Sequence, residues 1–356
     1  MNNEISQVNI EQRVVIDEVL NDYDINFSDV DITPLGNGHI NQTYKVTTPL
    51  FEFVLQKINH SIFTKTLELC DNTEKINRHL LQQQKRSKYP FLVPKQLLTK
   101  SGKTYVNVGE NYWRLMEFIK GSTTIETIDS PEQAALVANT FAKFSCALNN
   151  FNAEDLDITI DGFHDINYRI QQLKEAVKHN KQKRLSHCQS LVNFCFEQVT
   201  FINHVNAISK NLPLHVTHND TKINNLLFDN TGQPCAVIDL DTCMPGFLMH
   251  DFGDMVRTCC SNLAEDDSNI DKMTLKKDVF HALIQGYQTA FADKMTSTEK
   301  ESLLVGAKLL PFMIGVRFLT DHLNGDTYFN TNRKNQNLDR AMNQLHFYQL
   351  VCLIQC

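Results

Sequence analysis

The chain has 356 residues, enough for two lobes that each bury a core of their own. Its content of 42% hydrophobic and 21% charged residues is typical of a globular protein, and its net charge of −7 argues against a general nucleic-acid binder. The ten cysteines contain no Cys-x-x-Cys pair, and we find neither a signal peptide nor an uninterrupted apolar run of membrane-spanning length. We therefore expect reduced thiols, no membrane partner and a cytoplasmic protein.

The first third of the chain mixes helix and strand patterns. The expected elements are a helix up to about residue 28, strands between about residues 30 and 58, a helix over roughly 66–84, and strands at 96–98 and 112–119. A run of antiparallel strands with one helix after the third is the order of a kinase-like amino-terminal lobe. We assign residues 1–119 to this lobe and expect it to bind a nucleotide.

Helix patterns dominate after Gly121. Ser130 and Pro131 suit the N-cap and the first position of a helix, and apolar residues then recur at helical spacing. Further helices are expected over about 165–181, 186–209, 275–293, 297–323 and 333–353, with one strand-like interruption at 213–245. We therefore predict an α+β, bilobal, protein-kinase-like fold, in which residues 120–356 form a helical lobe that carries the catalytic loop and the acceptor site.

The segment from His215 to Phe228 carries the strongest chemical signal. Asp220 and Asn225 stand five positions apart, as do the Asp and Asn of the kinase template His-Arg-Asp-x-x-x-x-Asn. Asp220 could orient an attacking hydroxyl and accept its proton. Lys222 could neutralise a moving phosphoryl group as a flexible point charge. The alternative interpretation is a turn in which Asp and Asn serve turn geometry alone.

A metal site is expected beside this loop. Asn225 offers an amide oxygen and Asp239 a carboxylate oxygen, the types of ligand that Mg²⁺ prefers. Asp251-Phe252-Gly253 also spells the metal-binding triplet of protein kinases, but it lies much further from Asn225 along the chain. We therefore assign the metal to Asp239. We expect Asp251 to be structural, either capping the next helix or bonding the backbone of the catalytic loop.

Two segments of the first lobe are candidates for contacts with nucleotide phosphates. The turn Gly36-Asn37-Gly38-His39-Ile40-Asn41 could bring backbone amides close to phosphates, although an ordinary hairpin turn is an equal alternative. On the third strand a kinase normally carries a lysine that pairs with a helix glutamate, for which Glu74 is our candidate. Here Gln56 takes the inward position and Lys57 points the other way, because side chains alternate along a strand. Either a bulge turns Lys57 inward, or Gln56 acts without a charge.

The strand from Trp113 to Ile119 is placed to link the two lobes. Its backbone from Glu117 to Ile119 is expected to bond the adenine edge, although an ordinary buried strand would have the same residues. The complete set of expected nucleotide-binding residues is Gly36, Asn37, Gly38, Asn41, Gln56, Lys57, Glu74, Glu117 and Ile119.

Together these segments resemble the aminoglycoside phosphotransferase and choline kinase family of small-molecule kinases, and within it the N-acetylhexosamine 1-kinases. The similarity extends over nearly the whole chain. The segments that carry it are 36–41, 55–59, 217–225, 238–242, 251–254, 315–321 and 326–329. The chain departs from the protein-kinase pattern where Asn41 replaces a third glycine and where the third-strand lysine is missing.

This resemblance implies an enzyme that uses ATP and Mg²⁺ to phosphorylate the anomeric hydroxyl of an N-acetylhexosamine, with Asp220 as the base. The residues that it places against the sugar are His39, Asp220, Phe247, Arg317 and Tyr328. An arginine supplies several directed donors for hydroxyl and carbonyl oxygens, and an aromatic face suits the apolar side of a pyranose. The alternative for Arg317 is an ion pair with Asp321, four residues further along a helix.

Other interpretations remain open. The reaction could be the same with choline, ethanolamine, an aminoglycoside or another metabolite as the acceptor. The sequence Cys243-Met244-Pro245-Gly246-Phe247 half-resembles the Cys-x-Pro-x-Arg sequence of sulfatases, which would suggest a mucin-desulfating activity, but Phe247 replaces the required arginine. A non-catalytic pseudokinase is the last alternative, because the third strand matches the lysine of the kinase pattern only weakly.

Overall fold

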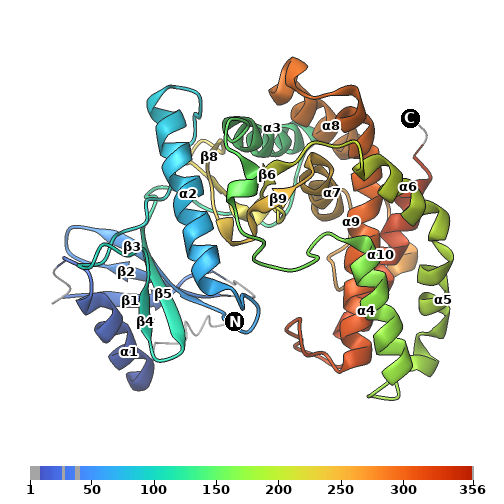
Figure 1. The fold of residues 1–356 in the computed structure, drawn as a ribbon, viewed down its shortest axis with the longest axis horizontal. Helices are drawn as coiled ribbons and strands as arrows, with labels where there is room; N and C mark the ends of the chain where they lie inside the picture. The colour runs from blue at the N-terminus through green and yellow to red at the C-terminus, as the bar shows by residue number, and fades with distance from the viewer. Residues whose placement is uncertain (1–8, 26–28, 37–40, 355–356) are drawn as a thin grey trace.

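An antiparallel sheet and a larger helical part lie side by side, and helix α2 (Thr66–Lys85) stands between them (Figure 1). The structure is a computed structural model that describes residues 9–25, 29–36 and 41–354. It confirms the expected α+β class, with the sheet formed by the first part of the chain and helices by the rest.

The sheet part also contains α1 (Ile10–Asn21), β1 (Asp31–Pro34), β2 (Gln42–Thr47), β3 (Glu52–Ile58), β4 (Val106–Val108) and β5 (Asn111–Glu117). The helices of the other part are α3 (Pro131–Ala147), α4 (Ile166–His179), α5 (Gln189–Glu197), α6 (Val199–Ser209), α7 (Leu248–Cys259), α8 (Lys277–Phe291), α9 (Ser297–Asn324) and α10 (Gln336–Cys352). Between α6 and α7 lie β6 (His215–Thr217), β7 (Leu226–Phe228), β8 (Pro234–Val237), β9 (Met244–Gly246) and the 3-10 turns η3 (Ile223–Asn225) and η4 (Leu240–Thr242).

The five strands of the sheet are antiparallel and run in the order β1-β2-β3-β5-β4. Ile16 and Val19 of α1 belong to the same apolar cluster as Phe53 and Leu55 of β3. Because side chains alternate along a strand, the other face of β3 carries Gln56. Helix α1 therefore covers one face of the sheet and leaves the other for contacts with the helical part.

The strand that we predicted at residues 96–98 is wrong. This segment does run beside β5, with Leu97 N–H donating to the Leu115 carbonyl at 2.9 Å, but it forms only an isolated bridge between Gln96 and Met116. The strand that pairs with this side of β5 and forms that edge of the sheet is β4, three residues long.

Helices α7 and α9 pack unusually closely in the core of the helical part. A Cβ atom on Gly253 of α7 would lie 2.2 Å from the carbonyl oxygen of Gly306 on α9, and a Cβ on Gly306 would lie 2.0 Å from the carbonyl oxygen of Met249. Glycine at both positions is therefore what allows the two helix backbones to touch. This contact fixes the distance between two helices that both contribute to the site described below.

Helix α9 has a second property that bears on the expected absence of a membrane partner. Within the described residues, α9 alone is long and apolar enough to cross a membrane by length and composition. However, 83% of its most apolar window is buried inside the fold. Its apolar side chains are therefore used in packing against α4, α7 and α10.

Candidate active site

The predicted catalytic loop lies between two short strand pairs at the centre of the molecule. Strand β6 pairs with β9, and β7 pairs with β8, so that the chain from His218 to Asn225 is held at both ends. Within this loop Lys222 Nζ lies 2.9 Å from Asp220 Oδ1, and Asn225 Nδ2 donates to Asp220 Oδ2 at 3.0 Å. The spacing that the sequence suggested therefore brings these three side chains into direct contact.

The same hairpin places Asp239 next to Asn225. Ile238 N–H donates to the Asn225 carbonyl at 3.0 Å, and Asp239 follows directly with a φ of 60°. A positive φ is uncommon outside glycine and costs about 1–3 kcal/mol, so the surrounding bonds must hold it in place. Asn225 uses its Nδ2 for the Asp220 carboxylate and backbone carbonyl, which leaves its Oδ1 available as a ligand.

The charges of the loop fit a divalent cation. Burial would raise the pKa of Asp220, but the charge and hydrogen bond of Lys222 outweigh it and lower this pKa, so Asp220 is ionised at neutral pH. Burial, together with the carboxylates of Asp241 and Asp220, raises the pKa of Asp239 to about 7. In the described part of the chain, no three His, Cys, Asp or Glu side chains gather as a ligand set. A metal here would therefore have Asp239 and the amide oxygen of Asn225 as protein ligands, and Mg²⁺ usually takes its other ligands from water and phosphate.

The raised pKa of Asp239 should make magnesium affinity depend on pH. The folded-state pKa is about 7 and the ordinary value is 3.8, so the stabilisation by the protonated carboxyl is complete below the ordinary value and is lost as the pH rises through about 7. Mg²⁺ must displace this proton, so its apparent affinity should fall by about tenfold per pH unit below neutrality and level off above it. Titration calorimetry at about pH 6 and about pH 8 measures this dependence, which Asp239→Asn should remove. An affinity that is equal at both pH values contradicts the prediction.

Asp251 holds the backbone of the catalytic loop from α7. Its carboxylate accepts the N–H groups of His218 at 3.0 Å and Asn219 at 2.7 Å, and its carbonyl accepts the Thr221 hydroxyl at 2.6 Å. This confirms the structural role predicted for Asp251, and of the two forms considered it is the bond to the catalytic loop. The imidazole of His218 is buried and contacts the Ile238 carbonyl through Nε2 at 2.9 Å, which ties the loop to the strand before Asp239.

The sheet side of the site differs from the expected lysine–glutamate pair. Lys57 Nζ lies over the ring of Trp113, 5.9 Å from its centroid, in agreement with the prediction that it points away from Gln56. Glu74 forms an ion pair with Arg78 on its own helix, so the expected pair with the third strand is not formed. A side chain that the sequence argument missed, Arg114 of β5, occupies this place instead.

Arg114 is buried, with 2% of its side chain exposed, and it connects the sheet to the residues that follow Asp239. Its Nε and Nη2 donate to Gln56 Oε1 at 3.0 and 2.7 Å, and its Nη1 forms an ion pair with Asp241 Oδ1 at 2.6 Å. Asn41 donates to the other carboxylate oxygen of Asp241 at 2.7 Å. The Arg114–Asp241 contact joins residues far apart in the sequence, so no local sequence pattern predicts it.

The other predicted nucleotide contacts are placed as follows. Gly36 has a φ of 71°, which a turn after β1 requires, but Asn37, Gly38 and His39 lie outside the described residues. In the predicted linker, the N–H of Glu117 donates to the Lys95 carbonyl at 2.9 Å. The carbonyl of Ile119 accepts the hydroxyl of Ser122 at 2.6 Å. Their roles toward a nucleotide stay predictions.

Arg317 of α9 lies among three aromatic rings. Its guanidinium carbon is 5.0 Å from the ring centroid of Phe163, 5.5 Å from that of Tyr328 and 5.4 Å from that of Phe329. Arg317 Nη2 also donates to the Tyr328 hydroxyl at 3.3 Å. Phe163 in turn lies beside His164, whose Nε2 is 3.3 Å from the Asn219 carbonyl, so Arg317 is connected to the catalytic loop through these two rings. Two of the five residues that the resemblance places against the sugar, Arg317 and Tyr328, are thus neighbours, and Phe163 joins them as a residue that we did not predict.

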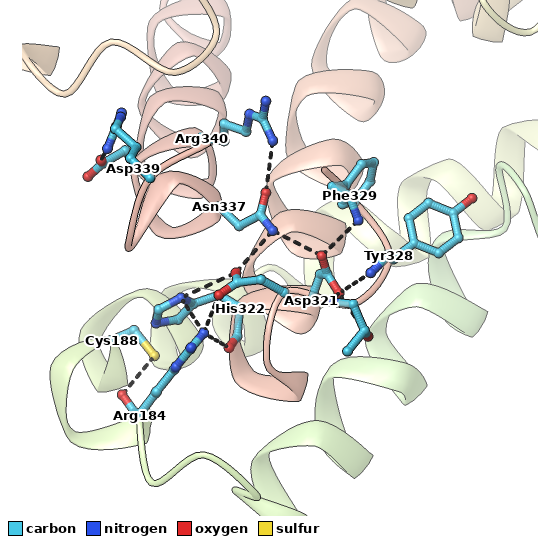
Figure 2. A network of polar contacts seen from close by, with 12 residues as sticks. Arg184, Cys188, Asp321, His322, Tyr328, Phe329, Asn337, Asp339 and Arg340 are labelled. Atoms are coloured by element: carbon cyan, nitrogen blue, oxygen red, sulfur yellow. Dashed lines mark hydrogen bonds and ion pairs between the residues drawn. The ribbon is translucent and has the colours of Figure 1, made fainter. Parts of the chain in front are cut away.

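Asp321, the alternative partner of Arg317, is used elsewhere (Figure 2). Its Oδ1 accepts the N–H groups of Thr327 and Tyr328, each at 2.9 Å, and its Oδ2 accepts the N–H of Phe329 at 3.0 Å and Nδ2 of Asn337 at 2.9 Å. The ion pair between Arg317 and Asp321 considered as an alternative is therefore not formed. Asp321 instead fixes the connection between α9 and α10, which presents Tyr328.

Phe247 lies further along a row of rings beside the catalytic loop. The ring centroids are 4.5 Å apart between Phe163 and His164, 4.8 Å between His164 and His250, and 5.5 Å between His250 and Phe247. His164 Nε2 is 3.3 Å from the Asn219 carbonyl, directly before Asp220. Burial lowers the pKa of His250 to about 4 and that of His164 well below its ordinary value, so both imidazoles are neutral at pH 7.

Comparisons with known proteins agree with this architecture. The phosphotransferase enzyme family matches residues 31–287, well over half of the chain. A microcompartment-associated aminopropanol kinase has a similar structure, with a TM-score of 0.62 and 16% identity over 95% of this chain and 96% of that one. Choline kinase LicA from Streptococcus pneumoniae gives a TM-score of 0.55 and 13% identity over 96% of this chain and 99% of that one.

A third similar structure is a spectinomycin phosphotransferase in complex with ADP and spectinomycin. Its TM-score is 0.51 and its identity 11%, over 96% of this chain and 97% of that one. At these identities the structures establish a shared fold, while the match over residues 31–287 establishes the family. The chain therefore belongs to the phosphotransferase enzyme family.

Proposed function

We propose that this protein is an ATP- and Mg²⁺-dependent kinase that phosphorylates the anomeric hydroxyl of an N-acetylhexosamine and releases a sugar 1-phosphate. The observation that carries the proposal is the contact of Asp220 with Lys222 and Asn225 in a loop that Asp251 holds rigidly. Use of ATP is supported by the ADP bound in the related spectinomycin phosphotransferase. Such a reaction would take place in the cytoplasm, where ATP is available.

Each residue of the loop then has a chemical role. Asp220, kept ionised by Lys222, would orient the acceptor hydroxyl and take its proton as the new bond forms. Lys222, in contact with Asp220, would offset charge on the transferred group. Asn225 and Asp239 would hold Mg²⁺, which when bound neutralises and aligns the phosphate oxygens. These roles need no cofactor other than Mg²⁺ and the nucleotide.

The preference for a neutral sugar over an amine rests on Arg317. Among the described residues no carboxylate forms an ion pair with this guanidinium, which aromatic rings surround instead. A cation that is not neutralised would repel an ammonium group brought close to Asp220, whereas it can donate to hydroxyl and acetamido oxygens. This argues against the amine acceptors that the names of the aminopropanol and choline kinases indicate for those proteins.

The sulfatase alternative fits the structure poorly. The thiol of Cys243 lies in a residue with 0% exposure, and burial raises its pKa well above the ordinary value. A protonated thiol without access to solvent has no route to a sulfate ester. The residue expected to be arginine in that sequence is Phe247, which lies beside His250.

The decisive experiment offers one acceptor at a time to the purified protein with ATP and Mg²⁺. The panel contains N-acetylglucosamine, N-acetylgalactosamine, glucose, choline, ethanolamine and an aminoglycoside, and ADP release is coupled to detection of the phosphorylated product. We expect turnover with an N-acetylhexosamine and a product that loses its reducing end. Turnover with an amine alone would overturn the choice of acceptor, and no turnover with any member would overturn the kinase.

Replacing Arg317 by Met should raise KM for the sugar roughly 10- to 100-fold, because a hydrogen bond from a charged donor contributes about 1.5–3 kcal/mol. KM for ATP should stay near the wild-type value. Steady-state kinetics with each substrate varied in turn measures both quantities. Arg333→Met, which removes an exposed arginine from the connection between α9 and α10, is the matched control. If Arg317→Met lowers the thermal stability and leaves KM for the sugar unchanged, the role of Arg317 is structural.

A further inference from the structure

The clearest departure of this chain from the kinase pattern lies in the sheet. The third strand carries Gln56 where a phosphate-binding lysine is expected. Glu74, the glutamate expected to pair with that lysine, forms an ion pair with Arg78 instead. A buried cation is nevertheless present at this place, on the neighbouring strand β5. Gln56 and Arg114 are directly opposite each other in the β3–β5 pairing, so the guanidinium of Arg114 lies beside the place where the third-strand lysine is expected.

We propose that Arg114 is a positioning residue for the segment 239–241, which carries the proposed metal ligand Asp239. Through its ion pair with Asp241, Arg114 fixes this segment against the sheet. This proposal rests on the kinase function above and adds a residue to it. It assigns to a cation on β5 the contact between the sheet and the segment that carries Asp239, whereas the third-strand lysine of the kinase pattern pairs with phosphates and a helix glutamate.

The geometry excludes a direct contact between Arg114 and a phosphate. Nε and Nη2 both donate to Gln56 Oε1, Nη1 is paired with Asp241, and only 2% of the side chain is exposed. A phosphate oxygen would have to displace one of these partners and enter a closed site. Arg114 therefore acts through Asp241 and not on the nucleotide.

The bonds around Asp241 form a continuous connection. Asn41 Nδ2 donates to Asp241 Oδ2 at 2.7 Å, while Asn41 Oδ1 accepts the N–H of Asn59 at 3.0 Å. Asn41 is the last residue of the glycine-containing turn and directly precedes β2, and Asn59 directly follows β3. The carboxylate of Asp241 is thus shared between a donor on β5 and a donor at the start of β2, and it lies two residues after Asp239.

The burial of the pair supports the same role. Arg114 and Asp241 are each only 2% exposed, so the guanidinium neutralises a carboxylate that solvent does not reach. Without Arg114 this carboxylate would be buried without its charged partner, two residues after Asp239. Arg114 also cannot be replaced by lysine without loss, because a single ammonium lacks the planar fork that reaches Gln56 and Asp241 together.

The test compares nucleotide binding with and without metal in Arg114→Lys and Asp241→Asn. We expect the affinity for ADP in the presence of EDTA to stay within about twofold of wild type, because neither residue contacts the nucleotide. The gain in affinity on adding Mg²⁺ should fall at least about tenfold, and kcat should fall with it. Titration calorimetry gives the first two quantities, and the acceptor assay gives the third.

Two further variants keep the test decisive. The double variant Arg114→Met/Asp241→Asn removes both charges and leaves no unpaired ion in the interior, so it should fold even if a single variant does not. Arg13→Met, on the outer helix α1, controls for the loss of an arginine from the sheet part.

Equal weakening of ADP binding with and without Mg²⁺ would overturn the proposal, because it would indicate a direct phosphate contact. A fall in melting temperature with an unchanged Mg²⁺ effect would also overturn it, since the ion pair would then serve stability alone. Absence of turnover in the wild-type protein would instead refute the kinase function. The binding results remain interpretable in that case.

Discussion

Asp220→Asn should lower kcat by about 10²- to 10⁴-fold while KM for ATP changes little, because the substitution removes the proposed proton acceptor and preserves the shape of the side chain. Asparagine can still accept from Lys222, whose Nζ lies 2.9 Å from Asp220 Oδ1, so the loop should keep its conformation. Single-turnover kinetics separates this loss in the chemical step from any change in binding.

A matched control for this substitution is Asp161→Asn. Asp161 also pairs with a lysine, Lys65, at 2.8 Å, but its side chain is 72% exposed and lies outside the catalytic loop. It should leave kcat unchanged within error. A residual rate above about one tenth of wild type for Asp220→Asn would show that another group accepts the proton, or that none needs to.

Asp251→Ala is expected to have the largest effect on stability. The substitution leaves the N–H groups of His218 and Asn219 without their acceptor in a site where Asp251 itself is only 1% exposed. An unsatisfied buried donor costs about 1–3 kcal/mol, so the free energy of unfolding should fall by roughly 2–6 kcal/mol. This is a large part of the about 5–15 kcal/mol that stabilises a typical domain. Urea denaturation measures the change, and kinase activity should fall in parallel because the loop loses its anchor.

Asp229 provides a control, because its carboxylate also accepts two backbone N–H groups but is not buried. Its carboxylate accepts the N–H groups of Thr231 at 2.8 Å and Gln233 at 3.0 Å in the turn between β7 and β8, and Asp229 is partly exposed there. Water can replace the carboxylate in Asp229→Ala, so this variant should be much less destabilised. Equal losses for the two variants would mean that burial does not decide the contribution of Asp251.

The parts of this site that the sequence predicts are those built from one continuous segment. Asp220, Lys222 and Asn225 lie within six residues of one another, so their spacing alone brings them together. The long helices are predictable for the same reason, since their apolar periodicity extends over several turns. The preference for Asp239 over Asp251 as metal ligand also came from distance along the chain, and the bonds of Asp251 to the loop agree with it.

Contacts between distant segments are where the sequence argument failed. The pair of Arg114 with Asp241 depends on the register of β5 beside β3, which no local pattern specifies. Arg317 and Asp321 have the spacing of a helix ion pair, yet the buried carboxylate of Asp321 accepts three backbone N–H groups from the connection between α9 and α10 instead. In both places the requirement to satisfy buried polar groups determined the partner, and this requirement is visible only once the fold is known.

The close contact between Gly253 and Gly306 limits how this protein can change its acceptor. Gly253 lies two residues after Asp251, and Gly306 lies on the helix that carries Arg317, so a side chain at either position would push apart the helices that support the proposed base Asp220 and the proposed acceptor contact Arg317. A wider acceptor therefore cannot be accommodated by separating these helices. We expect variation in substrate size to be confined to the segments that bring Phe163 and Tyr328 against Arg317, which are the segment before α4 and the 325–330 connection.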